Sequence, residues 1–206
     1  MKFTAMSLAA LAFMSVGCQQ TARLDWKAPA PAVKLTPVYC DNLALDRRES
    51  VAATKLEGEA IGKHTFSLFA IPVGNINADV TTPVQPSFDH AVRDALKAAG
   101  YDPRPASEAP AGSPILKGEI RQCYFWSYMW FWPVIVQGGE VKVALLVDRP
   151  GHSVVWQDQF KRYAPGAAFG GSFGFDIMAK DALTKLVGDI AQGCASEKFR
   201  AAVASK

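Results

Sequence analysis

The chain has 206 residues, of which 50% are hydrophobic and 20% are charged, and this is the composition of a globular protein rather than a disordered one. The length suits one ordinary domain. The net charge of +3 is small, and the densest basic cluster is the pair Arg47 and Arg48. Because nucleic-acid binders normally carry a basic stripe or patch, the charge pattern argues against nucleic acid as a partner.

The N-terminus has the pattern of an export signal. Lys2 is followed by an uncharged apolar run that begins at Ala5, and Gly17 then precedes Cys18. The run is shorter than the roughly 20 apolar residues that a membrane span needs. We expect residues 1–17 to be a signal peptide that is removed on export. If the signal is an ordinary one, Cys18 has no special role.

The segment "SVGC", which ends at Cys18, resembles the lipobox of bacterial lipoproteins. The resemblance implies that Cys18 becomes the lipidated first residue of the mature chain, held to a membrane by acyl chains such as palmitate. In that family an Asp after the cysteine favours retention at the inner membrane. Gln19 stands at this position, so the resemblance implies a lipid-anchored protein at the periplasmic face of the outer membrane.

The residues after the anchor predict a tether and then a domain. Residues 18–32 are polar and then rich in alternating Ala and Pro, which is typical of a flexible tether. Residues 33–206 are expected to form a single periplasmic domain. It contains Cys40, Cys123 and Cys194, and since three cysteines leave at least one unpaired, their pairing stays open. Their spacing matches no metal framework, so we expect no metal and no cofactor.

The first predicted elements are two weak strands and a clear helix. Residues 33–40, "VKLTPVYC", alternate apolar and polar side chains around a proline, and residues 66–76, "FSLFAIPVGNI", are apolar and end in turn residues. A helix is predicted over residues 88–102, because apolar residues repeat at helical spacing with charges opposite. Ser87 is the expected N-cap and Gly100 the expected stop.

After a predicted loop, three strands follow one another in the sequence. The first starts at Ile115 and runs through an aromatic segment, the second covers residues 140–148, and the third covers residues 153–163. A Pro-Gly turn separates the last two and predicts a hairpin. The loop "PGAAFGGSFG" then leads to a second predicted helix, from Phe175 to Gly193, and a short helical tail.

These elements together predict a fold class. Strands joined by hairpins form antiparallel sheets, and two amphipathic helices need a sheet face to cover. The sequence therefore predicts an α+β fold: an antiparallel sheet of about four to five strands with two helices packed on one face, which is a two-layer sandwich.

The segment "CYFWSYMWFWP" concentrates aromatic side chains in one place. In a strand, alternate residues share a face. One face would carry Tyr124, Trp126, Tyr128, Trp130 and Trp132. Three interpretations stay open for this candidate binding surface: a buried core, a surface resting on the outer membrane, and a groove for an apolar or glycan ligand or a docking face for a protein. A membrane span is disfavoured, because Pro133 interrupts the run.

One catalytic pattern occurs, G-x-S-x-G around Ser172. That motif needs a strand before it and a histidine after it, whereas the last histidine, His152, precedes Ser172. His64, His90 and His152 share no motif, and we expect them to be solitary and exposed. No phosphate-binding or dinucleotide-binding motif occurs. We therefore expect no catalytic residues, and a protein that is not an enzyme.

Four features resemble the YajG-like group of small bacterial outer-membrane lipoproteins. They are the lipobox, the segment "LALDRRE" with Asp46 and Arg47, the helix that ends in Gly-Tyr, and the later strand series. The resemblance implies an anchored periplasmic α+β domain without known catalytic residues. We expect a non-catalytic binding or accessory module of the cell envelope, held to the membrane by its lipid anchor, with an envelope protein as partner. The alternative is a carrier or auxiliary subunit that binds a lipid or another apolar ligand through the aromatic strand.

Overall fold

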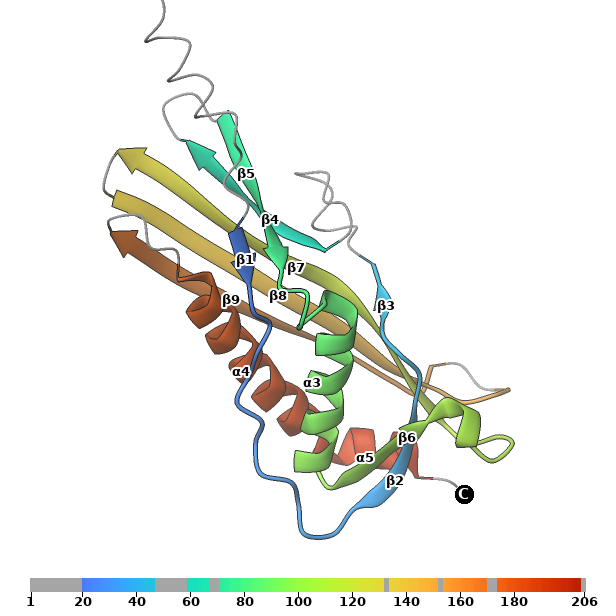
Figure 1. Ribbon diagram of the computed structural model, residues 1–206. Coiled ribbons are helices and arrows are strands. Elements are labelled where there is room, and N and C mark those ends of the chain that lie inside the picture. Colours follow the sequence, from blue (N-terminus) through green and yellow to red (C-terminus); the bar gives the residue numbers. More distant parts are fainter. Residues whose placement is uncertain are drawn as a thin grey trace, which may run out of the picture.

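The computed structural model describes residues 20–46, 59–66, 71–131, 134–151, 154–169 and 174–204. In these ranges nine strands form one mixed sheet, a half-barrel with the helices on one of its faces (Figure 1). The strands are β1 (Gln20–Ala22), β2 (Thr36–Cys40), β3 (Ala44–Leu45), β4 (Ala60–Phe66), β5 (Ile71–Ala78), β6 (Tyr101–Pro105), β7 (Ile115–Phe131), β8 (Val134–Asp148) and β9 (Trp156–Phe169). The helices are α3 (Val84–Ala98), α4 (Phe175–Cys194) and α5 (Glu197–Val203), with a short 3-10 turn at Ala106–Glu108.

The predicted two-layer sandwich with an antiparallel sheet of four to five strands and two helices is wrong. The described sheet has more strands, is mixed, and is accompanied by three α-helices. Antiparallel ladders join β4 to β5, β7 to β8 and β8 to β9, whereas parallel ladders join β1 to β5, β2 to β6 and β7, and both β3 and β4 to β7. Parallel neighbours come from distant parts of the chain, so no hairpin signal in the sequence predicts them.

Helix α3 starts at Val84 rather than near Phe88, because its cap comes from another part of the chain. The Glu59 carboxylate accepts a hydrogen bond from the backbone N–H of Val84 at 2.9 Å, and the expected cap, Ser87, is buried inside the helix. A cap supplied from a distance leaves no local sequence signal. Gly100 follows the helix with a φ of 97°, which glycine adopts easily, so the predicted stop is confirmed.

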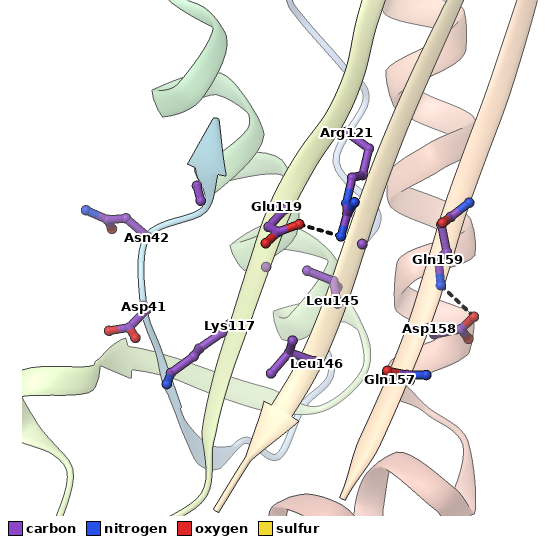
Figure 2. Close-up of a pocket in the computed structure, with 13 residues that line it drawn as sticks. Asp41, Asn42, Lys117, Glu119, Arg121, Leu145, Leu146, Gln157, Asp158 and Gln159 are labelled. Atoms are coloured by element: carbon purple, nitrogen blue, oxygen red, sulfur yellow. Dashed lines mark hydrogen bonds and ion pairs between the residues drawn. The ribbon is translucent and has the colours of Figure 1, made fainter. Parts of the chain in front are cut away.

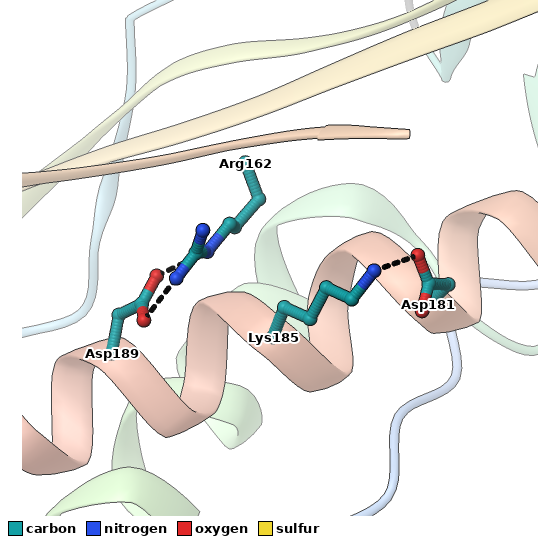
Figure 3. A network of polar contacts seen from close by, with 4 residues as sticks. All are labelled: Arg162, Asp181, Lys185 and Asp189. Carbon is teal, nitrogen blue, oxygen red and sulfur yellow. Dashed lines mark hydrogen bonds and ion pairs between the residues drawn. The ribbon is translucent and has the colours of Figure 1, made fainter. Parts of the chain in front are cut away.

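Helix α4 starts at Phe175, as predicted, and two ion pairs lie along its exposed side (Figure 3). The Arg162 guanidinium of β9 donates two hydrogen bonds to the Asp189 carboxylate of α4. Lys185 pairs with Asp181 one helical turn away, at 2.7 Å. All four side chains are partly exposed, so each pair contributes at most about 1 kcal/mol. The main attachment of α4 to the sheet is therefore its buried apolar face.

The core lies between the helices and the covered face of the sheet. Phe88 of α3, Phe125 of β7 and Phe175 of α4 are at most 1% exposed, and each such side chain contributes about 2–3 kcal/mol of burial energy. Cys40 and Cys194 are buried there as thiols, and burial raises the pKa of Cys40 to about 12. Both cysteines therefore behave as small apolar core residues rather than as reactive thiols.

The expected tether is packed against the domain from β1 onward. β1 pairs with β5, Leu24 is 0% exposed, and the indole N–H of Trp26 donates a hydrogen bond to the Asp94 carboxylate at 3.1 Å. The prediction of a flexible tether over residues 18–32 therefore fails for the described part of that range. The reason is that the few apolar side chains of this segment pack against the core and are buried there. Cys18 and the predicted signal peptide lie outside the described residues.

Candidate functional site

The candidate site is the face of β7, β8 and β9 that is turned away from α3 and α4, which we call the outer face (Figure 1). Along β7, Phe125 and Ser127 are at most 2% exposed, whereas Tyr124 and Trp126 are half-buried and Tyr128 is 41% exposed. Successive side chains therefore alternate between the core and the outer face, as predicted for a strand. The role of the outward residues in binding stays a prediction.

The remainder of the aromatic segment can be placed only in part. Trp132 and the side chain of Trp130 lie outside the described residues, whereas the backbone of β7 is described as far as Phe131. The segment forms a long strand of the sheet. In the part of the chain that the structure describes, no helix is long and apolar enough to cross a bilayer.

A β-bulge at Arg121 sets which side chains of β7 reach the outer face. Ile120 pairs with Val143, and the next pair is Gln122 with Lys142, so Arg121 is an extra residue without a partner in the ladder. Ile120 points into the core and is 0% exposed. Arg121 and Gln122, which follow it, are both half-buried. Arg121 keeps the outward side that the alternation gives it, and the bulge shifts the alternation by one residue from Gln122 onward, so that Cys123 rather than Gln122 is buried.

Beyond the bulge, the outer face carries an aromatic patch, which we define as Tyr124, Trp126, Tyr128, Val136 and Tyr163. Tyr128, Val136 and Tyr163 are 41%, 43% and 49% exposed. A Cβ atom placed on Gly138 would lie 2.3 Å from Cζ2 of Trp126 and 2.8 Å from the hydroxyl oxygen of Tyr163. The missing side chain at Gly138 therefore lets a ring from β7 and a ring from β9 meet across β8.

Before the bulge, the outer face is hollowed into a groove of about 600 Å³ (Figure 2). Its floor is formed by β7, β8 and β9, and the segment between β2 and β3 lies along one side. Its polar side chains include Asp41, Asn42, Lys117, Glu119, Gln157 and Gln159. The outer face thus has two halves, an aromatic patch and a polar groove, on opposite sides of the bulge.

Three charged side chains of the groove, Lys117, Glu119 and Arg121, take part in ion pairs. Nη2 of Arg121 lies 2.6 Å from Oε2 of Glu119, and Nη1 of Arg121 lies 3.9 Å from the Asp46 carboxylate. Nζ of Lys117 lies 2.7 Å from the Asp148 carboxylate, and this hydrogen bond raises the pKa of Lys117. The charges of these pairs offset one another, and the lining also contains the carboxylates of Asp41 and Asp158, so the groove suits polar ligand groups that donate hydrogen bonds.

A buried polar row lies on the covered side of the sheet. His64 of β4 is 3% exposed, its Nδ1 lies 2.5 Å from Oγ of Ser127, and the Phe175 ring packs edge-on against it at a centroid distance of 5.3 Å. Gln137, which pairs with Ser127 in the sheet, is 2% exposed. The expectation that His64 is exposed is therefore wrong, because it belongs to a strand that the sequence did not predict. His90 is exposed, as expected.

The pair of His64 and Ser127 is a serine–histidine contact that the sequence motifs missed. Both side chains are closed off from solvent, which favours a role in packing. The motif serine, Ser172, and His152 lie outside the described residues. Among the residues that the structure describes, no group of three or more His, Cys, Asp or Glu side chains could hold a metal ion.

Burial lowers the pKa of His64 from 6.5 to about 4. The unfolded chain therefore takes up a proton, as the pH falls, that the folded chain does not. We expect the free energy of unfolding to drop by about 2 kcal/mol between about pH 7.5 and about pH 5. Urea denaturation at several pH values measures this. His64→Gln should lose most of the dependence and His90→Gln should keep it, and equal slopes in the two variants would contradict the assignment.

No family model matches the sequence, and no curated protein matches it. Among solved structures, the chain is similar to protein XCC0632 from Xanthomonas campestris, of the family DUF330. The two share 10% identity with a TM-score of 0.52, and the match covers 85% of this chain and 95% of that one. At this level of identity the likeness shows a common fold and nothing more specific.

Two further solved structures resemble the chain more distantly. One is the PelC dodecamer from Paraburkholderia phytofirmans, with 16% identity, a TM-score of 0.35, and coverage of 79% of this chain and 92% of that one. The other is a candidate lipoprotein from Caulobacter crescentus CB15, with 9% identity, a TM-score of 0.35, and coverage of 61% and 89%. Their TM-scores are too low to carry an argument. The fold likeness thus rests on XCC0632 alone, and membership of the YajG-like group stays a prediction.

Proposed function

We propose that this chain is a non-catalytic accessory lipoprotein of the bacterial cell envelope. In this proposal it is anchored through Cys18 to the periplasmic face of the outer membrane and binds another envelope protein through its outer face. The observation that carries the proposal is the aromatic patch, whose side chains stand on a sheet face that no helix covers in the described part of the chain.

Aromatic side chains on a rigid strand are well suited to protein binding. Tyr and Trp bury a large area at a low cost in conformational entropy, and they dominate the energetics of many interfaces. Trp126 and Tyr163 meet over Gly138, so their rings lose little freedom when a partner binds. The polar groove beside the patch supplies the hydrogen-bonding groups that usually surround an apolar interface centre.

The alternative function, carriage of a lipid within the domain, has less support. It requires a cavity behind the aromatic strand. The side chains on that side of β7, Cys123, Phe125 and Ser127, are at most 2% exposed and are packed in the core. An acyl chain would have to displace these side chains, at the cost of their burial energy.

The anchor and the family rest on the sequence. The lipobox ends at Cys18, and the "LALDRRE" segment, the helix that ends in Gly-Tyr and the strand series are similar to the YajG-like group. The fold likeness to XCC0632 is compatible with this assignment, since that protein is also bacterial and is covered almost completely by the match.

A photo-crosslinking amino acid at position 163, introduced into the full chain in growing cells, tests the partner. Because Tyr163 is 49% exposed on the patch, we expect one crosslinked protein band, and Trp126→Ala should remove it without changing the amount of chain. The same crosslinker at the exposed Lys198 of α5 is the control and should give no such band. Recovery of lipid alone, or equal bands from positions 163 and 198, would contradict binding through the outer face.

A further inference from the structure

Strands β4, β5, β7, β8 and β9 each have one end at the same end of the sheet, the upper end in Figure 1. A continuous register row crosses the sheet below this end, from Lys63 through Trp126 and Gly138 to Pro165. We call the part of the sheet beyond that row the tip. It consists of residues 64–66, 71–74, 127–131, 134–137 and 166–169.

The tip is free of charge. Its described residues include no Asp, Glu, Lys or Arg, although 20% of the whole chain is charged. Lys63 is the last charged residue of β4 before the tip, and Tyr128 and Val136 beyond it are 41% and 43% exposed. Ends of strands that face water normally carry charged and turn-forming side chains, so this composition indicates a less polar neighbour.

The predicted lipid anchor leaves the domain close to the tip. β1 begins at Gln20, which is level with Phe125 of β7 through the pairs with Ile76 and Gly62. β1 is parallel to β5, β5 is antiparallel to β4, and β4 is parallel to β7, so β1 runs opposite to β7 and its N-terminal end points towards the tip. Cys18 stands two residues before Gln20 and hence within about 7 Å of it.

The sheet extends further than the anchor can reach. β7 continues from Phe125 to Phe131, which is about 20 Å at the usual rise of a strand. The tip therefore projects about 10 Å or more beyond the point where the acyl chains leave Cys18. When those chains are embedded in a bilayer, an end of the sheet that points the same way has to meet the bilayer surface.

We infer that the tip contacts a phospholipid surface beside the lipid anchor, and this inference rests on the proposed lipidation of Cys18. The absence of charge removes the main cost of reaching the boundary between headgroups and acyl chains, and exposed aromatic side chains such as Tyr128 favour that position. The tip contact adds a second attachment to the acyl chains and fixes the orientation of the domain. Tyr128 and Val136 of the aromatic patch then meet the bilayer, whereas Tyr124, Trp126 and Tyr163 lie before the tip. These three side chains, and the groove beyond them, are directed into the periplasm, where a protein partner can reach them.

Dye quenching in vesicles tests the contact. The full lipid-modified chain, purified from cells, is reconstituted into vesicles of phosphatidylethanolamine and phosphatidylglycerol with the polarity-sensitive dye NBD at Val136→Cys, or at Tyr128→Cys as a second tip position. The matched control is Gln159→Cys, which is exposed on the same outer face but in the groove. We expect brominated phospholipids to quench the dye at the tip at least about twofold and to leave the dye in the groove unchanged.

The outcomes separate the tip contact from the anchor. Metabolic labelling with a palmitate analogue, lost in Cys18→Ser, establishes the anchor independently. If the chain is labelled but dyes at positions 136 and 128 are quenched no more than the dye at 159, the tip does not touch the membrane and the inference is wrong. If the chain is not labelled, the proposed anchor fails, and the inference fails with it.

Discussion

Replacing Gly62 with alanine is expected to lower the free energy of unfolding by at least about 3 kcal/mol. Gly62 lies in the middle of β4 and pairs with Phe125 of β7. A Cβ atom at this position would lie 1.8 Å from the carbonyl oxygen of Phe125 and 2.7 Å from its carbonyl carbon. Both are backbone atoms in a continuous sheet, so no change of rotamer relieves the overlap. The strands would have to separate and lose ladder hydrogen bonds.

The same substitution in α4 is the matched control. At Gly188 an added Cβ atom meets nothing within 4 Å, and alanine is a better helix former than glycine. Gly188→Ala is therefore expected to raise the free energy of unfolding by about 0.5–1 kcal/mol. Urea denaturation followed by circular dichroism measures both variants. Similar small effects at the two positions would contradict the close contact of β4 with β7.

The regular elements with long periodic patterns could be predicted from the sequence. Helix α4 starts at the predicted Phe175, because its apolar residues repeat at helical spacing over several turns. Strands β7, β8 and β9 follow one another with clear alternation, and a Pro-Gly turn marks the second hairpin. In these cases, the information that specifies the element is contained in the element itself.

The mixed topology could not be predicted, because its determinants are distant in sequence. β1 and β3 are too short to show any periodicity. β4 contains Lys63 and His64, which resemble surface residues until the strand is placed between β5 and β7. The region expected to be one strand from Phe66 supplies the end of β4 and the whole of β5. The secondary structure of each of these segments is determined by its pairing with distant strands rather than by its local sequence preference.

The outer face was predictable in part. Alternation alone places Tyr124, Trp126 and Tyr128 on one face of β7. The bulge also leaves a trace in the sequence, since the spacing of the core residues Ile120 and Cys123 breaks the period of two. The exposure of the patch and the existence of the groove depend on which segments cover the sheet. Which segments cover the sheet depends on tertiary structure, and the residue types of β7 alone do not predict it.

Phe125→Ala is expected to lower the free energy of unfolding by about 3–5 kcal/mol. The side chain is 0% exposed, and its ring lies against Gly139 of β8, where a Cβ atom would come within 2.1 Å of Cδ1. Tyr128→Ala, on the outer face of the same strand, removes a ring that is 41% exposed and should cost less than about 1 kcal/mol. Comparable losses in the two variants would mean that the faces of β7 are assigned wrongly.

A second substitution makes the test of this packing sharper. Gly139→Ala alone should cost about 1–3 kcal/mol, because the new methyl group collides with the Phe125 ring. In the Phe125→Ala background the collision is gone, and the methyl group fills part of the vacated space. The double variant should therefore be more stable than the sum of the two single effects predicts, by about 1 kcal/mol or more. Denaturant midpoints of the four proteins measure this coupling. Simple additivity would show that the ring does not lie over Gly139, and the alternation that turns Trp126 and Tyr128 outward would lose its support.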